Sequence, residues 1–349
     1  MTLLINGHAI GPGHRPYVIA EMSGNHNGDL SRAYQLIEAA KAAGADAVKL
    51  QTYTADTITI DHDGPGFVIE GGLWDGRSLY ELYQEASTPW EWHPALFAKA
   101  RELEIDIFSS PFDPTAVDYL ESLGCPAYKI ASFELVDIPL IQKAARTGKP
   151  LIMSVGMAND AEIEEAVAAV RACGNAQIVL LHCVSAYPAP ASDMNLAAIG
   201  RLAQRFGTAS GLSDHSMGIT VPVTAVALGA SVIEKHFTLR RADGGPDSGF
   251  SLEAHELAEM VSACATAHQA IGTAEVRQCD SQEGNKVFRR SLYVTADIAA
   301  GTAITEAHVR SIRPGFGLAP KHLPAVLGKT AARDLKKGEP FDWSMIVSA

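Results

Sequence analysis

The sequence contains no apolar run of the length that a membrane-spanning helix needs, which is about 20 residues. Residues 1 to 16, MTLLINGHAIGPGHRP, also lack the charged start and the apolar stretch of a secretory signal. Cysteine is scarce: the five residues form no CxxC pair, so we expect reduced thiols rather than a disulfide framework. These absences predict a cytoplasmic protein that is neither exported nor embedded in a membrane.

Positive charge is also in short supply. The chain has 28 Lys and Arg against 40 Asp and Glu, which gives a formal net charge of -12. This balance argues against nucleic acid or an anionic membrane surface as a partner. An anionic substrate would therefore have to be captured by a local group of cations.

Eight short apolar runs each end in polar residues, and helix-like sequence usually follows. The runs cover residues 17 to 21, 46 to 51, 106 to 110, 127 to 132, 151 to 155, 178 to 183, 209 to 215 and 231 to 236. This alternation predicts a (β/α)8 TIM barrel whose polar residues lie at the carboxyl ends of the strands, where barrel enzymes place their catalytic groups. An accidental alternation of strands and helices is the alternative, and the agreement of all eight runs speaks against it.

The pattern changes after Gly272. Before it, helical spacing of apolar residues predicts helices that include residues 29 to 43, 159 to 173 and 253 to 272. After it comes a polar stretch and then short alternating strands with little helix. We divide the chain into a barrel at 1 to 275, a linker at 276 to 288 and a small β-rich domain at 289 to 349.

Two histidines, His215 and His236, stand at the ends of the seventh and eighth predicted strands. Neighbouring strands would bring both imidazoles to one divalent metal ion, and two protein ligands leave positions for water and substrate. The alternative is a pair of surface or hydrogen-bonded histidines among the 12 in the chain.

Ammonium and hydroxyl groups form a second set at the strand ends: Lys49, Lys129, Ser132, Ser154, Ser185 and Ser213. Two lysines in the mouth of an acidic protein would attract an anion, and the hydroxyls could complete a cage around a phosphate or carboxylate. Each lysine could instead be the structural partner of a glutamate inside the barrel. The equivalent places of the two lysines, with serines between them, favour an anionic ligand.

Carboxylates form a third set on the same rim: Glu21, Glu134, Asp214, Glu234 and Asp247. In a cationic site, carboxylates can hold a water molecule or relay a proton. Others serve as counter-ions, and the residue types alone leave both roles open.

Motifs along nearly the whole chain resemble the sialic acid synthases. In the barrel they are IAEMSGNHNGD (19 to 29), AGADAVKLQTY (43 to 53), SSPFD (109 to 113), YKIASFEL (128 to 135), SVGMA (154 to 158), LHCVSAYPAP (181 to 190), GLSDHSMG (211 to 218) and IEKHFTL (233 to 239). Further along, RRS (289 to 291), IRPGFG (312 to 317) and KKGEPF (336 to 341) resemble the antifreeze-like (SAF) domain of that family. The combination is far more specific than any one motif.

The resemblance implies condensation of phosphoenolpyruvate with a free amino-sugar aldehyde, which yields a nine-carbon 2-keto acid and phosphate. The lysine and serine set would hold phosphoenolpyruvate, and Mn²⁺ or Mg²⁺ on His215 and His236 would polarise the aldehyde. Glu21, with Glu134 as second candidate, would orient or deprotonate the attacking water. The sugar would meet Gln51, Tyr187 and Asp247.

The same resemblance implies a homodimer in which the antifreeze-like domain caps the barrel of the partner subunit. Arg313 of that domain would then complete the neighbour's site.

Within the family, the loop LWDGRSLYELYQEASTPWEWH (73 to 93) resembles the pseudaminic acid synthases, which act on a 2,4-diacetamido-2,4,6-trideoxy hexose. Ser185 stands where N-acetylneuraminate synthases tend to carry Asn. The alternative is an N-acetylneuraminate or legionaminate synthase that uses N-acetylmannosamine or a related amino sugar. In that case Trp74, Trp90 and Trp92 would only pack against outer helices.

Two other classes are less well supported by the sequence. A synthase acting on a phosphosugar would need a second anion site, and no further group of Arg or Lys falls on the rim. A sugar-binding or ice-binding protein without catalysis would leave the histidine pair and the lysine pair without a role.

Overall fold

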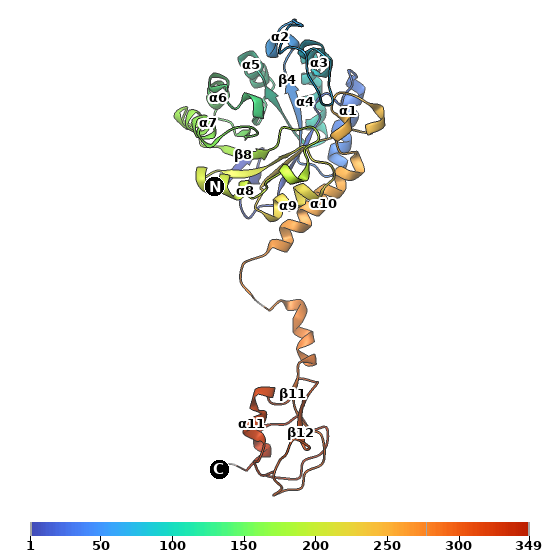
Figure 1. Ribbon diagram of the computed structural model, residues 1–349, viewed down its shortest axis with the longest axis vertical. Coiled ribbons are helices and arrows are strands. Elements are labelled where there is room, and N and C mark those ends of the chain that lie inside the picture. The colour runs from blue at the N-terminus through green and yellow to red at the C-terminus, as the bar shows by residue number, and fades with distance from the viewer. Residues whose placement is uncertain (1, 277, 348–349) are drawn as a thin grey trace. The chain divides into compact units, whose positions relative to one another are not determined.

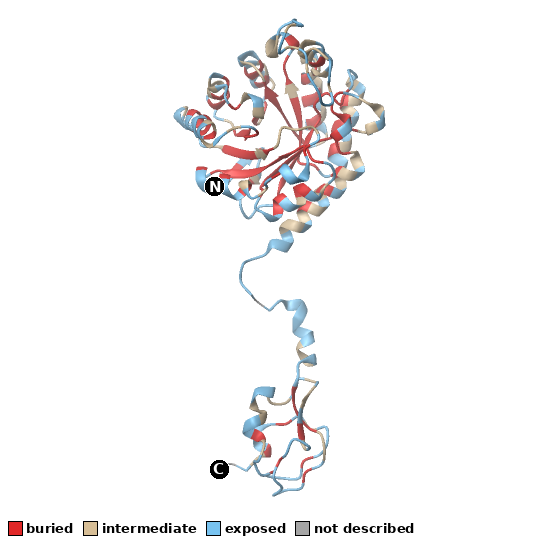
Figure 2. Cartoon of the chain, in the orientation of Figure 1, coloured by how far each residue is buried: buried red, intermediate tan, exposed pale blue. Residues whose placement is uncertain are grey.

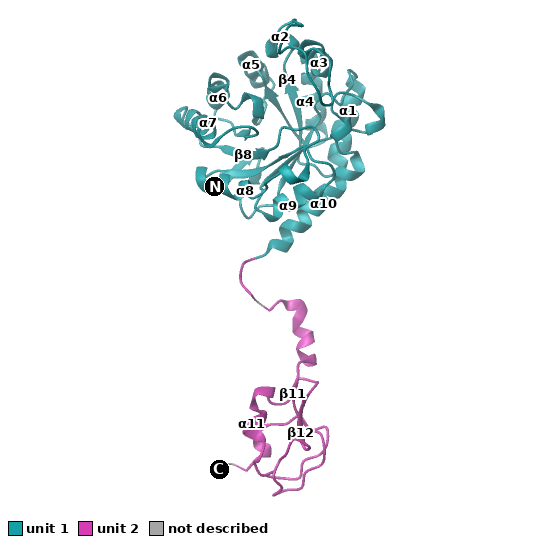
Figure 3. Ribbon diagram, viewed as in Figure 1, with its two compact units in different colours: residues 1–272 teal, residues 273–349 magenta. Residues whose placement is uncertain are grey.

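The computed structural model describes residues 2–276 and 278–347 of the chain. They belong to two compact units, Met1–Gly272 and Thr273–Ala349 (Figure 3). The sequence predicts the end of the barrel domain at residue 275. Among the described residues, no helix combines the length and the apolar character needed to cross a membrane.

The first unit is a closed barrel of eight parallel strands, which confirms the predicted fold class (Figure 1). The strands are β3 (Tyr17–Glu21), β4 (Ala47–Thr52), β5 (Asp106–Pro111), β6 (Tyr128–Ile130), β7 (Leu151–Ser154), β8 (Ile178–Cys183), β9 (Ala209–Asp214) and β10 (Val232–His236). Each pairs with the next in chain order, and β10 pairs with β3 to close the ring. In that last pairing, His236 lies opposite Glu21.

Helices surround the strands. They are α1 (Leu30–Ala42), α4 (His93–Glu102), α5 (Pro114–Ser122), α6 (Ile138–Ala145), α7 (Asp160–Ala172), α8 (Ala198–Phe206), α9 (Thr220–Ala227) and α10 (Ala254–Ile271). The helix α1 begins after Asp29, whose side chain accepts a hydrogen bond from the backbone N–H of Ser31. In α7, Asn159 and Glu162 form a capping box. Caps of this kind stabilise a helix by about 1 kcal/mol each, and they explain why the predicted helices start where they do.

The barrel strands are buried on both faces (Figure 2). Alternate side chains of a strand therefore point either into the barrel or toward the surrounding helices. In β10, Glu234 and His236 face into the barrel, whereas Lys235 between them faces the helices, because successive side chains of a strand point to opposite faces. The strands thus hold an apolar core between sheet and helices and present polar groups along the axis of the barrel.

A hairpin covers the amino end of the barrel. Its strands, β1 (Leu3–Ile5) and β2 (His8–Ile10), are antiparallel. The side chain of His8 contacts Asp106 at the start of β5 with an N–O distance of 2.9 Å, and the buried Tyr17 hydroxyl donates to the same carboxylate at 2.7 Å. Polar contacts thus hold this end together, far from the carboxyl ends of the strands.

The long connection between β4 and β5 contains two further helices, α2 (Ala55–Ile58) and α3 (Leu79–Ala86), besides a 3-10 turn at Trp90–Trp92 and α4.

The second unit has its own apolar core and contains the antiparallel pair β11 (Ser291–Val294) and β12 (Val309–Ile312) with the short helix α11 (Leu323–Val326). The predicted linker is not wholly irregular. Asp280–Phe288 forms a 3-10 helix in which Lys286 pairs with Glu283 at 2.5 Å.

Candidate active site

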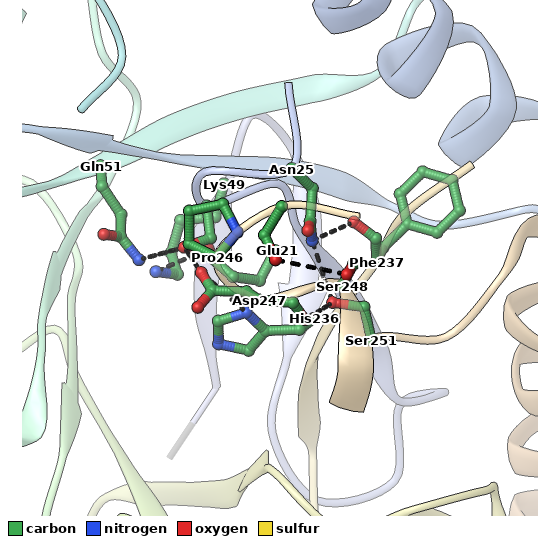
Figure 4. Close-up of polar contacts among 12 residues, drawn as sticks. Glu21, Asn25, Lys49, Gln51, His236, Phe237, Pro246, Asp247, Ser248 and Ser251 are labelled. Carbon is green, nitrogen blue, oxygen red and sulfur yellow. Dashed lines mark hydrogen bonds and ion pairs between the residues drawn. The ribbon is translucent and has the colours of Figure 1, made fainter. Parts of the chain in front are cut away.

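Four charged side chains from β3, β4, β6 and β10 meet inside the barrel. The Lys49 ammonium lies 2.7 Å from a Glu21 oxygen and 3.5 Å from Glu234, and the Lys129 ammonium lies 3.7 Å from the same Glu234 oxygen. All four residues are buried, and Gln51 donates a hydrogen bond to Glu21 at 2.8 Å (Figure 4). The two lysines therefore do converge, and each also has a glutamate partner.

The two glutamates of this network differ in pKa. Burial raises the pKa of Glu21 to about 7, although the Lys49 ammonium acts against the shift. Burial also acts to raise the pKa of Glu234, but Lys129 and Lys49 together outweigh it and hold that pKa below its ordinary value. Of the two glutamates, Glu21 is thus the one that changes charge near neutral pH. Burial acts on a lysine of the network too and lowers the pKa of Lys129.

Hydroxyl groups gather around Gly156, in the turn after β7. A Cβ atom at this position would lie 2.6 Å from the Ser185 Oγ and 2.8 Å from the Ser132 Oγ, so only glycine leaves room for both side chains. The Ser154 Oγ is buried without a hydrogen-bond partner, and Ser213 is buried in β9. A buried hydroxyl without a partner is suited to donate to an oxyanion.

The imidazole rings of His215 and His236 lie with their centroids 5.3 Å apart. The Nδ1 of His215 lies 2.9 Å from the carbonyl oxygen of Val184. A carbonyl oxygen only accepts, so Nδ1 carries the proton of this hydrogen bond, and in the neutral ring the lone pair is on Nε2. The Nδ1 of His236 is buried without a hydrogen-bond partner and lies 3.9 Å from an Asp247 carboxylate oxygen (Figure 4). Burial and the neighbouring His215 hold the pKa of His236 well below its ordinary value, so this ring is neutral.

Each of the two imidazoles has one nitrogen for which the described residues offer no hydrogen-bond partner, and such a pair of nitrogens fits a divalent metal ion. Among the residues that the structure describes, no group of three or more His, Cys, Asp or Glu has the arrangement of a complete metal site. The donors present therefore suit an ion that takes its other ligands from water or substrate, which is the open arrangement of a Lewis-acid site rather than that of a structural one.

A pocket of about 530 Å³ opens beside these groups. Its polar lining includes Gln51, Glu134, Tyr187, His236 and Asp247. Its apolar wall includes Tyr53, Ile58, Ile69, Trp74, Leu79 and Phe112. An apolar pocket with a few polar groups at one side is the usual form of a small-molecule site.

Trp74 belongs to the pocket, whereas the two other tryptophans of the loop do not. Its indole N–H donates to the Pro246 carbonyl at 2.9 Å, and its ring lies 5.5 Å from that of Tyr187. Trp90 stacks on Tyr119 with a centroid distance of 4.8 Å, and Trp92 packs edge-on against His26. The loop thus reaches the pocket through one tryptophan, and the other two pack among the helices.

Within the barrel, the structure brings most of the predicted site residues together, with one exception. Asp214 does not belong with the other carboxylates of the rim: it faces the helices and pairs with Lys235. Its neighbours Ser213 and His215 face inward, as the alternation along a strand requires. Arg313 lies exposed in the second unit, which the structure describes separately from the barrel.

Two residues that were not predicted from the sequence organise the polar side of the pocket. Ser23 donates to the Asp247 carboxylate and accepts from Gln51 at 3.1 Å. Asn25, fully buried, donates to the Phe237 carbonyl at 2.9 Å and so ties the turn after β3 to the chain after β10 (Figure 4). The polar, glycine-containing turn directly after the first barrel strand was the available signal.

The chain matches the model of the NeuB family over residues 36–276 and that of the SAF domain over residues 289–347. It is 48% identical to a pseudaminic acid synthase of Helicobacter pylori, over 93% of this chain and 96% of that protein. It is 36% identical to an N,N'-diacetyllegionaminic acid synthase of Legionella pneumophila, over 95% of this chain and 94% of that protein.

Among solved structures, the chain resembles an N-acetylneuraminic acid (sialic acid) synthetase from Leptospira borgpetersenii serovar Hardjo-bovis. The two share 32% identity with a TM-score of 0.73, over 82% of this chain and 95% of that one.

The pocket carboxyl of Glu134 should titrate near neutrality. Burial raises its pKa from an ordinary 4.5 to about 7, and its Oε2 is buried without a hydrogen-bond partner. The folded chain then binds this proton more tightly than the unfolded chain, so the contribution of Glu134 to the free energy of unfolding falls as the pH rises from about 4.5 to about 7.

Nuclear magnetic resonance of protein labelled at the glutamate carboxyl carbons measures this directly. We expect one signal that titrates near pH 7 to vanish in Glu134→Gln and a second to vanish in Glu21→Gln. Glutamate signals that all titrate below pH 5 would contradict the description of both groups.

Proposed function

The chain belongs to the NeuB family, and from this premise we propose that it catalyses the reaction of the pseudaminic acid synthases. In this reaction phosphoenolpyruvate condenses with 2,4-diacetamido-2,4,6-trideoxy-β-L-altropyranose to give pseudaminic acid and phosphate. The observation that carries the proposal is the similarity to the Helicobacter pylori pseudaminic acid synthase, at 48% identity. The Legionella pneumophila legionaminic acid synthase, which represents the alternative substrate, reaches 36%.

Phosphoenolpyruvate would be held in the interior of the barrel. Its phosphate and carboxylate are anions, and Lys49 and Lys129 are the buried cations that converge there. The hydroxyl groups of Ser132 and Ser185, on either side of Gly156, would donate to the same oxygens. Fixing the enol in this way orients its nucleophilic carbon toward the pocket, and holding two reactants in place removes a large part of a bimolecular barrier.

A base with a pKa near the working pH is needed to orient or deprotonate the attacking water. Glu21 meets this requirement, because burial raises its pKa to about 7 and its carboxylate lies among the groups proposed to hold phosphoenolpyruvate. Glu134 has a similar pKa and lines the wider pocket, so it remains the second candidate. The Gln51 amide keeps one Glu21 oxygen oriented through its hydrogen bond of 2.8 Å.

The sugar aldehyde would approach the two imidazoles from the pocket. Mn²⁺ or Mg²⁺ held by His215 and His236 would supply Lewis-acid polarisation of its carbonyl group. Asp247, oriented by Ser23, faces the same space and is placed to accept hydrogen bonds from hydroxyl or acetamido groups. Tyr187 packs on His215 with a centroid distance of 4.4 Å and keeps that ring in place.

The apolar wall suits a sugar with a methyl group in place of the C6 hydroxymethyl group. Ile58, Ile69 and Leu79 offer no hydrogen-bond partner for a hydroxyl group, and Trp74 closes the wall toward Tyr187. A deoxygenated carbon would bury its surface there without loss of hydrogen bonds to water.

A homodimer in which the SAF domain caps the partner's barrel is also part of the proposal. Large apolar side chains are exposed on loops after the strands of the barrel: Phe133, Val136, Met157 and Met217 are 59%, 60%, 64% and 53% exposed. The second unit exposes Phe316 beside the Arg313 segment. Large apolar side chains exposed on the loops at one end of a barrel are typical of a surface that a partner covers.

The first test concerns the sugar. We expect kcat/KM, measured by phosphate release, to be higher with 2,4-diacetamido-2,4,6-trideoxy-altrose than with N-acetylmannosamine. Rejection of an added hydroxyl by an apolar wall is worth about 1 to 3 kcal/mol, or about 10- to 200-fold. The Trp74→Phe variant should narrow this ratio, whereas Trp90→Phe, which alters a tryptophan stacked on Tyr119 outside the pocket, should leave it unchanged. Equal values for the two sugars in the unaltered protein would favour the alternative substrate.

The second test concerns the metal ion. Chelator treatment should abolish phosphate release, and added Mn²⁺ or Mg²⁺ should restore it. His215→Ala and His236→Ala should each lose activity by several orders of magnitude while circular dichroism shows an intact barrel. Full activity of either variant, or full activity in excess chelator, would remove the metal from the proposal.

The third test concerns the cap. Arg313→Ala and Lys129→Ala subunits should each be inactive alone, and mixed dimers should recover part of the activity, because one of their two composite sites then contains both groups. Heterodimers verified by differential tagging that stay inactive would show that each domain serves its own barrel.

A further inference from the structure

A buried ion pair lies directly behind the two histidines, on the outer face of the barrel. The Lys235 ammonium contacts an Asp214 carboxylate oxygen at 2.5 Å, and the two side chains are 1% and 0% exposed. Lys235 immediately precedes His236 in β10, and Asp214 immediately precedes His215 at the end of β9. The pair plays no part in the chemistry proposed above, because it faces the helices and not the pocket.

Lys235 holds the chain on both sides of His215. Its ammonium also donates to the backbone carbonyl of Ser216 at 2.5 Å. The second oxygen of Asp214 accepts from the Ser216 backbone N–H at 2.9 Å. The residues before and after His215 are therefore both bound, directly or through each other, to one side chain of β10.

This contact continues where the backbone ladder stops. The register between β10 and β9 runs from Val232 opposite Gly211 to Lys235 opposite Asp214 and includes no partner for His236. The other restraints tie each histidine to a different neighbour: the His215 ring meets the Val184 carbonyl after β8, and the residue after His236 donates its N–H to the Glu21 carbonyl in β3. Beyond the last backbone pair, Lys235 opposite Asp214, the Lys235 side chain extends the connection between the two histidine-bearing ends as far as Ser216.

Stability alone is a poor reason for a charged pair at this place. Taking two charges out of water costs about as much as their attraction returns, and apolar side chains of similar volume are often equally good or better. The surroundings between sheet and helices are apolar. Geometry is a better reason, because a lysine with three donors can hold a carboxylate and a carbonyl at fixed positions, whereas an apolar contact cannot.

We propose that Lys235 is a positioning residue that fixes the separation of the His215 and His236 imidazoles through Asp214 and Ser216 and so sets the affinity for the metal ion. This inference rests on the metal role proposed above. Groups that orient metal ligands from behind change metal affinity by about 10- to 100-fold when they are removed.

The test measures Mn²⁺ binding without sugar or phosphoenolpyruvate. The electron paramagnetic resonance signal of free Mn²⁺ falls as the ion binds, so a titration gives the Kd for the unaltered full-length chain and for each variant. Lys235→Met keeps the apolar stem and removes the ammonium; we expect its Kd to rise about 10- to 100-fold. Asp214→Asn keeps an acceptor for Lys235, so we expect a smaller rise in its Kd for Mn²⁺. This conservative variant keeps the test valid if Lys235→Met folds poorly.

Tyr17→Phe is the matched control. It removes the buried hydrogen bond from the Tyr17 hydroxyl to Asp106 at 2.7 Å. Tyr17 is in β3, the strand next to β10, but it lies at the amino end of the barrel. If it lowers the melting temperature and leaves the Kd for Mn²⁺ unchanged, a general loss of stability does not explain the effect of Lys235→Met. Steady-state kinetics add a second readout: the Mn²⁺ concentration for half-maximal activity should rise in parallel with the Kd, and kcat at saturating Mn²⁺ should change much less.

The outcomes separate this inference from the proposal beneath it. If the unaltered chain binds no Mn²⁺, or if His236→Ala binds it equally well, the metal role fails and the inference fails with it. If the unaltered chain binds Mn²⁺ and His236→Ala does not, but folded Lys235→Met and Asp214→Asn both keep the unaltered Kd, the metal role stands and the positioning role of Lys235 is overturned.

Discussion

The contact between Lys49 and Glu21 is the constraint on which the site depends. Two ammonium groups and two carboxyl groups are buried within a few ångströms, and none of them would be tolerated there alone, because an unpaired buried charge is costly. The Lys49 ammonium lies 2.7 Å from Glu21, and both lysines contact the same Glu234 oxygen. These attractions offset the cost of burying the four charged side chains. Burial nevertheless raises the pKa of Glu21 to about 7 against the effect of Lys49, so Glu21 can gain or lose a proton near neutral pH.

The strands and the inward residues could be predicted from the sequence because both depend on local pattern. A run such as 178 to 183 is apolar, of strand length, and followed by turn and helix signals, and the structure has β8 at Ile178–Cys183. Position at a strand end was enough to select Lys49 and His236. It was not enough for Asp214. A one-residue shift along a strand reverses the face that a side chain points to, and four polar residues follow one another at the end of β9 and directly after it, from residue 213 to residue 216.

Contacts between distant segments could not be predicted in this way. Ser23 is one hydroxyl among many in the sequence, and its importance comes from a carboxylate 224 positions away. The tryptophans illustrate the same limit: Trp74, Trp90 and Trp92 look alike in a loop rich in aromatics, yet the first lines the pocket and the others pack on Tyr119 and His26. Which side chain reaches the pocket is decided by the path of the folded loop, and composition does not encode that path.

The site combines a buried network of charged groups with a pocket that has an apolar wall. This combination limits how the site can discriminate between sugars. An apolar wall rejects a hydroxylated analogue only weakly, whereas a buried polar group left without its partner rejects an analogue much more strongly. The wall around Ile69 and Trp74 therefore cannot be the main source of selectivity among closely related amino sugars. Asp247 is a stronger candidate, because it is buried, its pKa is raised chiefly by burial, and Ser23 fixes its orientation. A sugar that offers Asp247 no donor would leave the desolvated carboxylate with only its contacts inside the protein, such as that from Ser23, and that cost falls on the wrong substrate alone.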